Sequence, residues 1–393
     1  MKIVILHLDY SAYFTARLLS FQNHLRNNDE LHILEILGTS PLYPFLDVSK
    51  KDLNNYELLM PNSTYDTADI KEMGKLIREK LNKLQPDVIL AGPLAFPSSA
   101  TALKWAKKNN RGIILFDDCH KDTFIRSKLN TYVKKYLYAC VDAFFCPSED
   151  YKESYMGWGF KESQIFYGLN VVDNDFWWYK GEYLYDIKNS YFLVIGRQVP
   201  FKNLEGFINA YLDYQKRGGY IPIIFVGNGP EHEKLIRIAN DNPLIKFETF
   251  KKPKELKELY KNARALFVPS FKTETWGLVV NEAMCAGKAV AVSKECGCAN
   301  TLVQNKINGW VFDPHNHENM IEVLNYAQNI TYENLIEYGK NSQDIIKDWN
   351  LNKFCSGLYS SMIYANTHHK KYGIISRIFL ALWNGRLNKM ERV

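Results

Sequence analysis

Short apolar segments alternate with helix-like segments along this chain, and this alternation constrains the fold more than any other feature. The strand-like segments of the first half lie at 3–6, 87–91, 112–116 and 142–146. Those of the second half lie at 191–196, 221–227, 265–268 and 289–293. Parallel strands need helical crossovers, so this pattern is typical of a parallel sheet with helices on both faces. The sequence therefore predicts an α/β protein with two Rossmann-like, doubly wound domains that face a cleft.

A polar stretch at 171–190 separates the two halves and predicts the domain boundary. We expect an N-terminal domain at 1–175, a C-terminal domain at 190–352 and a helical tail at 353–393. A chain of 393 residues is long enough for two domains with cores of their own.

The cysteine pattern and the lack of long apolar runs indicate in which cellular compartment the protein is expected. The seven cysteines are odd in number and show no disulfide-framework spacing, which indicates a reducing environment. Cys296 and Cys298 are too close together for the usual zinc-ligand spacing, so they predict a turn of small residues. No secretory signal is visible, and no run reaches the ~18 apolar residues of a membrane span. We expect a cytoplasmic protein.

Two glutamates flank a glycine-containing turn that leads into a predicted helix. Glu274 precedes Gly277, and Glu282 follows it about one turn inside the helix. A helix N-terminus offers backbone N–H groups and the positive end of a dipole, and both suit a phosphate. Carboxylates beside that phosphate can hold hydroxyl groups. The pattern favours a diphosphate with a sugar on either side, which is a nucleotide-sugar. The alternative is that either glutamate only complements the helix dipole.

Two cations follow the strand at 191–196. Arg197 lies at the carboxyl end of this strand, and Lys202 lies five residues further on, at a helix start. They can converge on one anion, as a departing diphosphate requires, because negative charge grows on it while the glycosidic bond breaks. The alternative, two solvated surface charges, is weakened by the glutamate pair downstream.

These residues resemble the signature of family-4 retaining glycosyltransferases of the GT-B fold, also called glycosyl transferases group 1. The shared frame is Val268-Pro269-Ser270, Glu274, Gly277, Glu282-Ala283-Met284 and Gly287, preceded by Gly-Arg…Lys-Asn at 196–203. The resemblance is strong over 190–315, moderate over 86–176 and weak over 1–80. It implies a metal-independent hexosyltransferase with no cofactor, which uses a UDP- or GDP-sugar as substrate. It further implies a saccharide or lipid-linked acceptor and a role in cell-envelope polysaccharide biosynthesis.

The resemblance also implies roles for individual residues. Arg197 and Lys202 would stabilise the departing phosphate, and Glu274 would hold the donor sugar and stabilise its positive charge. Glu282 would accept hydrogen bonds from ribose hydroxyls. His120, in the loop after the strand at 112–116, would touch the donor sugar; a structural histidine is the alternative. Further donor contacts are expected at Gly196, Gly227, Gly229, Trp276, Gly277, Leu278 and Val279.

Some positions depart from the family pattern. The loop His7–Thr15, after the first strand, contains no glycine, whereas family members often have a glycine-rich loop there. Asp117-Asp118 before His120 is unusual, and Lys288 replaces an apolar or small residue. Asp173-Asn174-Asp175 mimics a metal-binding motif of the other glycosyltransferase fold, but it lies at the domain junction. We therefore predict no metal site.

The net charge of +6 is unevenly distributed. Residues 101–140 hold nine basic and three acidic residues, and 370–393 hold six basic residues and one acidic residue. The resemblance implies that the tail packs partly on the first domain. One face of its last helix carries Ile374, Ile375, Ile378, Phe379, Leu382 and Trp383. This face predicts either peripheral contact with the inner face of the cell membrane, through 101–140 and 370–393, or docking on the protein itself.

Other functions remain open at this stage. The chain could be a GT-B protein that binds nucleotide-sugars without catalysis, which the altered first loop favours and the intact Arg197, Lys202, Glu274 and Glu282 disfavour. A phosphorylase or an epimerase of the same fold is a further alternative. Nucleic-acid binding is not expected, because no recognisable module accompanies the basic residues.

Overall fold

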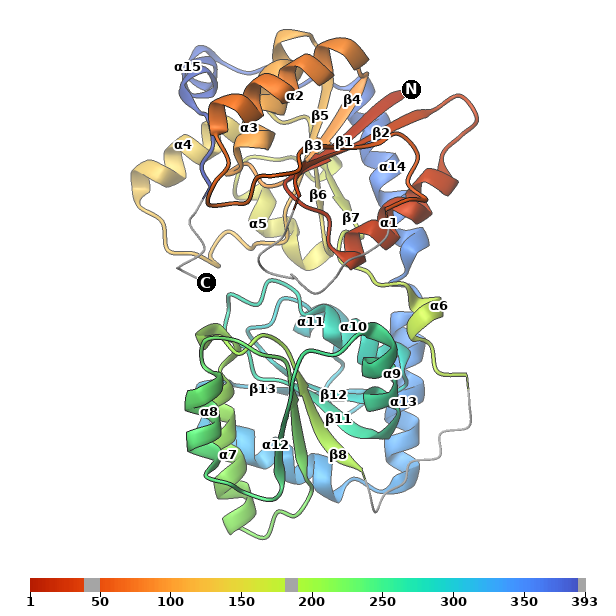
Figure 1. The fold of residues 1–393 in the computed structure, drawn as a ribbon, viewed down its shortest axis with the longest axis vertical. Coiled ribbons are helices and arrows are strands. Elements are labelled where there is room, and N and C mark those ends of the chain that lie inside the picture. Colours follow the sequence, from red (N-terminus) through yellow and green to blue (C-terminus); the bar gives the residue numbers. More distant parts are fainter. Residues whose placement is uncertain (39–49, 181–189, 388–393) are drawn as a thin grey trace. The chain divides into compact units, whose positions relative to one another are not determined.

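The structure is a computed structural model that describes residues 1–38, 50–180 and 190–387 (Figure 1). The chain forms two compact units. Unit 1 contains residues 1–171 and 351–393, and unit 2 contains residues 172–350. Part of the predicted boundary, at 181–189, and the last six residues lie outside the described residues. None of the described helices is both long and apolar enough to span a membrane.

Unit 1 is built on a seven-stranded parallel sheet in the order β3-β2-β1-β4-β5-β6-β7. Its strands are β1 (Lys2–His7), β2 (Glu30–Leu37), β3 (Tyr56–Met60), β4 (Val88–Ala91), β5 (Gly112–Phe116), β6 (Ala143–Cys146) and β7 (Ile165–Tyr167). The strand order reverses direction between β1 and β4, as in a doubly wound sheet. Polar groups that follow β1, β4 and β5 therefore meet at one edge of the sheet.

The helices of unit 1 come from both ends of the chain. They are α1 (Ala12–His24), α2 (Ile70–Leu84), α3 (Pro97–Lys108), α4 (Lys128–Tyr138), α5 (Lys152–Met156), α14 (Leu351–Thr367) and α15 (Ile374–Leu382). Short 3-10 helices lie at Glu149–Tyr151 and Glu162–Gln164. α14 packs on α1 and on strands β4 to β7. Its residues Phe354, Leu358 and Met362, spaced four apart on one face, are fully buried in the sheet core.

Local sequence explains how these helices begin. Asp69 caps α2, because its side chain accepts hydrogen bonds from the N–H groups of Lys71 and Glu72. α3 begins at Pro97. Proline suits the first helical position, where its fixed φ fits and its missing N–H costs nothing.

Unit 2 is built on a six-stranded parallel sheet in the order β10-β9-β8-β11-β12-β13. Its strands are β8 (Tyr191–Ile195), β9 (Ile223–Val226), β10 (Ile245–Glu248), β11 (Ala263–Val268), β12 (Ala289–Ser293) and β13 (Gly309–Phe312). Its helices are α6 (Asn174–Trp177), α7 (Leu204–Lys216), α8 (His232–Ala239), α9 (Pro253–Asn262), α10 (Leu278–Cys285), α11 (Ala299–Leu302), α12 (His317–Asn329) and α13 (Tyr332–Ile346). The predicted fold class, with two doubly wound parallel sheets, is confirmed.

Lys288, which departs from the family pattern, is buried in unit 2 just before β12. Its Nζ donates a hydrogen bond to the carbonyl oxygen of Lys261 at 2.7 Å. Burial lowers the pKa of Lys288 to about 7, from an ordinary value of 10.5. Above this pH the folded protein holds the amine mainly in its neutral form.

This burial predicts a pH dependence of stability. Between pH values of about 7 and 10.5, the unfolded chain binds a proton at Lys288 that the folded chain lacks. The contribution of Lys288 to the free energy of unfolding therefore rises with pH across this window. We expect urea denaturation to show a smaller rise for Lys288→Met than for the wild type. Equal pH slopes for the two proteins would contradict this prediction.

Candidate functional site

The loop after β8 brings the two predicted cations together. A 3-10 helix at Pro200–Lys202 folds this loop back before α7 begins. The Arg197 guanidinium carbon and the Lys202 Nζ lie 5.9 and 5.6 Å from the centroid of the Phe201 ring. Both cations therefore lie within 6 Å of one ring, and their convergence on a single anion stays a prediction. Asn203 fixes the end of the loop, because its Nδ2 donates to the carbonyl oxygen of Pro314 at 3.1 Å.

Glu274, in the loop after β11, forms an ion pair with Lys202. The Lys202 Nζ contacts Glu274 Oε2, and the Ser270 hydroxyl donates to the same oxygen at 3.2 Å. The side chains of Lys202 and Glu274 are 14% and 13% exposed, so the pair is held by the protein and still reaches solvent. Two residues that the sequence nominated for separate reasons are thus in direct contact.

The turn that carries Glu274 is held by a second turn, at 296–298. The N–H of Gly297 donates to the carbonyl oxygen of Glu274 at 3.0 Å, and the N–H of Cys298 donates to that of Trp276 at 3.1 Å. The Cys296 thiol donates to the same Trp276 oxygen at 2.9 Å. The three-residue turn predicted from the cysteine spacing therefore positions the Glu274 backbone.

Gly277 forms the junction between this turn and α10. It caps the helix with φ +95°, a left-handed conformation that favours glycine. A Cβ at this position would lie 3.0 Å from the Cys296 sulfur. The first turn of α10 follows directly, with backbone N–H groups at Leu278 and Val279 that have no carbonyl partner within the helix. The geometry required for the predicted phosphate contact is therefore present, and the contact itself stays a prediction.

Gly227 and Gly229 allow the loops after β8 and β9 to touch. A Cβ on Gly227 would lie 2.1 Å from the carbonyl oxygen of Gly196, and one on Gly229 would lie 2.4 Å from that of Gln198. No side chain fits at either position unless the backbone moves. Besides their predicted donor contacts, these glycines therefore have a packing role.

Sequence reasoning missed Gln198, a buried residue that fastens these two loops. Its Nε2 donates to the carbonyl oxygen of Gly227 at 3.0 Å, and its Oε1 lies 2.7 Å from His232 Nδ1. Its N–H donates to the carbonyl oxygen of Asn228 at 2.9 Å. Gln198 therefore positions Arg197. The sequence does carry a signal for this residue. Gln198 is an uncharged amide that lies between the predicted cations Arg197 and Lys202, just after a buried strand.

Glu282 lies in the interior of unit 2, in contrast to the partly exposed Lys202–Glu274 pair. It is fully buried, and its Oε2 accepts a hydrogen bond from the Tyr260 hydroxyl at 2.7 Å. A ribose hydroxyl can reach this carboxylate only if neighbouring side chains move. Trp276, also expected at the donor, is buried too and donates from Nε1 to Asn281 Oδ1 at 2.9 Å. The ribose contact stays a prediction, with that added condition.

His120 belongs to unit 1, in the loop after β5. Its ring stacks on Tyr151 with centroids 3.9 Å apart. The loop is fixed on both sides. The Tyr155 hydroxyl lies 3.2 and 3.0 Å from the carbonyl oxygens of Asp117 and Cys119, and Asn170 Nδ2 donates to Asp118 Oδ2 at 3.1 Å. His120 is therefore presented by a rigid loop.

Asp117, Asp118 and Cys119 are the one group in the described part of the chain whose ligand atoms cluster closely enough for a metal ion. Burial, together with the two carboxylates, raises the pKa of the Cys119 thiol well above its usual value. Neither carboxylate of this group is exposed, and both accept hydrogen bonds within unit 1. Asp117 Oδ1 accepts one from the N–H of Cys119 at 3.2 Å, and Asp118 Oδ2 accepts one from Asn170 Nδ2.

An aromatic cluster takes the place of the glycine-rich loop after β1. The His7 ring centroid lies 5.0 Å from Phe116, 5.7 Å from Phe96 and 6.0 Å from Phe14. Burial lowers the pKa of His7 to about 4, so its imidazole is neutral near pH 7. This end of β1 therefore offers aromatic surface and a neutral ring rather than a backbone cradle for phosphate.

Comparison with known proteins gives a family match for one segment. Residues 179–342, which lie within unit 2 and make up less than half of the chain, match the family model of glycosyl transferases group 1. No curated protein matches the sequence.

Similar solved structures cover nearly the whole chain. HepE of Anabaena, solved in complex with UDP, has a TM-score of 0.71 and 17% identity over 92% of this chain and 100% of its own. Sucrose-phosphate synthase of Thermosynechococcus elongatus has a TM-score of 0.72 and 14% identity, and the match covers 93% of this chain and 100% of the synthase chain. The lipopolysaccharide outer core galactosyltransferase WaaB has a TM-score of 0.68 and 16% identity, and the match covers 92% of this chain and 99% of WaaB. The chain therefore has the GT-B glycosyltransferase fold, and its unit 2 matches glycosyl transferases group 1.

Proposed function

We propose that this protein is a retaining glycosyltransferase that moves a hexose from a nucleotide-diphosphate sugar to a saccharide or lipid-linked acceptor. The observation that carries the proposal is the partly exposed Lys202–Glu274 ion pair. Arg197 lies on the same loop as Lys202, near the Phe201 ring, and α10 begins shortly after Glu274 in the sequence. The two cations and the helix start suit a diphosphate, and the carboxylate suits a sugar that gains positive charge.

The reaction follows from where charge develops. As the bond between the anomeric carbon and the β-phosphate oxygen breaks, negative charge grows on the diphosphate, where Arg197 and Lys202 stabilise it. A bound diphosphate competes with Glu274 for the Lys202 Nζ. Positive charge grows on the sugar ring, where the Glu274 carboxylate stabilises it. The acceptor hydroxyl attacks the same face of the sugar, and its proton passes to the departing phosphate oxygen.

Metal independence is part of this proposal. A diphosphate leaving group needs positive charge, which many enzymes supply with a metal ion. Here Arg197 and Lys202 both lie within 6 Å of the Phe201 ring and supply two positive charges from the protein itself. Activity in the presence of EDTA is the corresponding expectation.

The similar structures favour particular donors and acceptors. HepE is solved with UDP and with UDP-glucose, which supports a UDP-sugar as the donor; a GDP-sugar is the other candidate. WaaB acts on the lipopolysaccharide outer core, which supports an acceptor in cell-envelope polysaccharide synthesis. We place the enzyme in the cytoplasm, at the inner face of the cell membrane.

One observation favours a second candidate, a GT-B protein that binds nucleotide-sugars without catalysis. The aromatic cluster around His7 replaces a loop that often binds phosphate in the family. The Lys202–Glu274 pair argues for catalysis, since both predicted groups are present and in contact. Slow hydrolysis of the donor without an acceptor distinguishes the enzyme. A phosphorylase would instead release the sugar in a phosphate-dependent reaction.

A panel of nucleotide-sugars tests donor binding. We expect one of the UDP-, GDP-, ADP- and dTDP-sugar classes to raise the melting temperature in the presence of EDTA. A ligand at 100 times its Kd stabilises the folded state by about 2.7 kcal/mol, which a thermal scan detects easily. The absence of a shift with every nucleotide-sugar would contradict the proposed donor site.

Substitutions test the three groups given chemical roles. We expect Arg197→Ala, Lys202→Ala and Glu274→Ala each to lower kcat by roughly 100- to 1,000-fold, as loss of one charge-stabilising group does in other enzymes. The measurement is initial rate at saturating donor, with the melting temperature checked for each variant.

Lys234 provides a matched control, because it also forms a lysine–glutamate pair in unit 2, with Glu205, but both side chains are nearly half exposed. Lys234→Ala should keep the wild-type rate. If Glu274→Ala turned over its donor at the wild-type rate, the assignment of the site would be wrong.

A further inference from the structure

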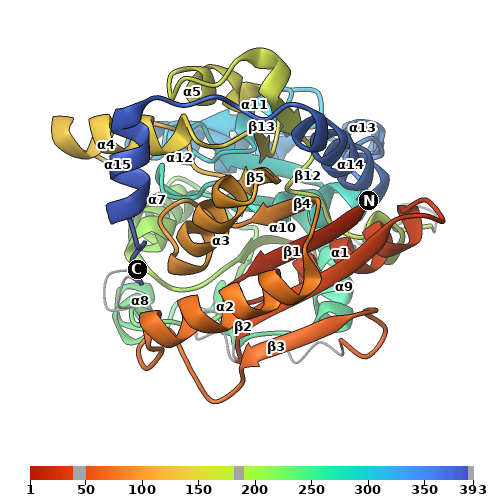
Figure 2. The same ribbon diagram turned by 90° about the horizontal axis from the view of Figure 1, so that it is seen from above.

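The two helices α4 and α15 of unit 1 lie side by side (Figure 2). The Phe379 ring of α15 lies 6.2 Å from Tyr132 and 5.9 Å from Tyr136, both on α4. Ser376 and Leu380 are buried on this inner face of α15. The last helix therefore docks on its own unit by one face, as one of the two interpretations of the tail predicts.

These two helices and the segment just before α4 also carry many exposed apolar side chains. In the described ranges, fifteen large apolar side chains are exposed, and eight of them lie here: Phe124, Ile125, Leu129, Tyr132, Ile374, Ile375, Ile378 and Leu382. We call these eight residues the α4–α15 surface. Ile125 is fully exposed, and Ile374 and Leu382 are more than 70% exposed. Eight exposed apolar side chains in two segments that pack together indicate an interaction site rather than scattered exposure.

The charged residues of these two segments are mostly basic. The exposed basic residues at 121–135 and 370–387 are Lys121, Lys128, Lys135, Lys371, Arg377 and Arg386. The same two ranges contain a single acidic residue, Asp122. Apolar side chains with a basic border are the chemistry of a helix pair lying on an anionic bilayer, where lysine and arginine meet headgroup phosphates.

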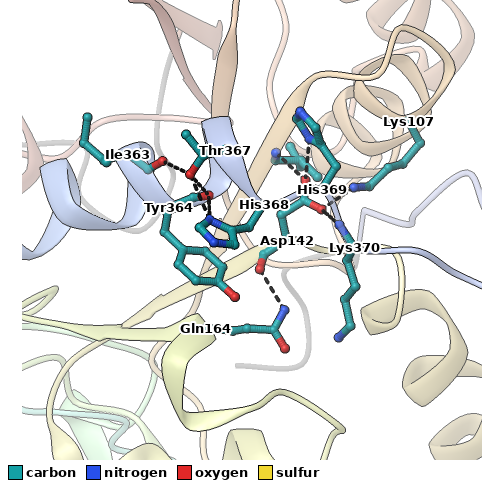
Figure 3. A network of polar contacts seen from close by, with 10 residues as sticks. Lys107, Asp142, Gln164, Ile363, Tyr364, Thr367, His368, His369 and Lys370 are labelled. Carbon is teal, nitrogen blue, oxygen red and sulfur yellow. Dashed lines mark hydrogen bonds and ion pairs between the residues drawn. The ribbon is translucent and has the colours of Figure 1, made fainter.

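The surface is preformed, because the chain is pinned on both sides of α15. Before the helix, the N–H of Lys370 donates to Asp142 Oδ1 at 2.6 Å, and Lys107 Nζ contacts the same oxygen at 2.5 Å (Figure 3). Asp142 is fully buried. After the helix, Trp383 Nε1 donates to the carbonyl oxygen of Leu94 at 3.0 Å. Membrane contact therefore does not require a loose tail to fold. The conformational entropy of this segment is already lost when unit 1 folds.

We propose that the α4–α15 surface docks unit 1 on an anionic phospholipid bilayer, with its apolar side chains at the acyl boundary and its basic residues on the headgroups. The excess of basic over acidic residues favours this occupant over a second copy of the chain, because two equally basic surfaces would repel each other. The docking does not depend on the proposed activity and can be tested separately from it.

Vesicle co-sedimentation of the full-length protein tests the docking. We expect the protein to bind vesicles of phosphatidylcholine mixed with phosphatidylglycerol much more tightly than vesicles of phosphatidylcholine alone. Binding to the mixed vesicles should weaken as salt rises, because salt screens the attraction. Lys128→Gln with Arg377→Gln should weaken it by roughly fivefold per residue at low salt.

Variants that replace apolar residues of the surface distinguish insertion of these side chains into the bilayer from charge attraction alone. Ile125→Glu with Ile378→Glu should weaken binding to the mixed vesicles by at least about tenfold, since two apolar side chains no longer enter the acyl boundary. Ile307→Glu, at an exposed isoleucine of unit 2, should bind like the wild type. All variants should keep the wild-type melting temperature and the same stabilisation by nucleotide-sugar, so a failure here is distinguishable from a failure of the donor site.

Three results would overturn the proposal. The first is a wild type that binds neither vesicle type, and the second is a double glutamate variant that still binds the mixed vesicles fully. The third is a lipid-free dimer, seen by sedimentation velocity, that the same double variant dissociates. In that case the surface is an interface between two copies of the chain.

Discussion

The ion pair between Lys202 and Glu274 is the interaction on which the account of the site depends. β8 and β11 are neighbours in the parallel sheet of unit 2, so the loops after them meet at one edge. The pair joins these loops, Gln198 ties the first of them to the loop after β9, and the turn at 296–298 supports the second. Three strand ends are thereby fixed around one partly exposed charge pair, and a ligand anion would find this arrangement already formed.

Unit 1 depends on residues from the far end of the chain in a similar way. α14 supplies part of the sheet core, and Asp142 holds the segment that follows it through a buried charge network. A buried carboxylate is tolerated only when hydrogen-bonded and paired, and here backbone N–H groups and Lys107 meet that need. The same network sets the position of α15, so the core and the exposed α4–α15 surface have a common support.

The sequence predicted the fold class because apolar strands and intervening helices follow a local rule. It also identified Lys202 and Glu274 as candidate site residues, each from its own motif, but it did not predict the contact between them. The two residues are 72 positions apart, and they meet only because β11 lies beside β8, which no local pattern shows. The burial of Glu282 under Tyr260 depends on how α9 packs, and the role of Gln198 depends on the neighbouring loop. These contacts depend on the tertiary structure, so the residue types alone could not predict them.

The most direct measurement is calorimetric titration of UDP and GDP, with EDTA present, into the wild type and into Lys202→Ala. In the proposed mechanism, Lys202 leaves Glu274 to hold a diphosphate. We therefore expect one of the two nucleotides to bind the wild type, and Lys202→Ala to lose at least about tenfold in affinity, as expected when a charged partner of a phosphate is removed. Equal affinity of both proteins for that nucleotide would show that the diphosphate lies elsewhere, and the central claim would be wrong.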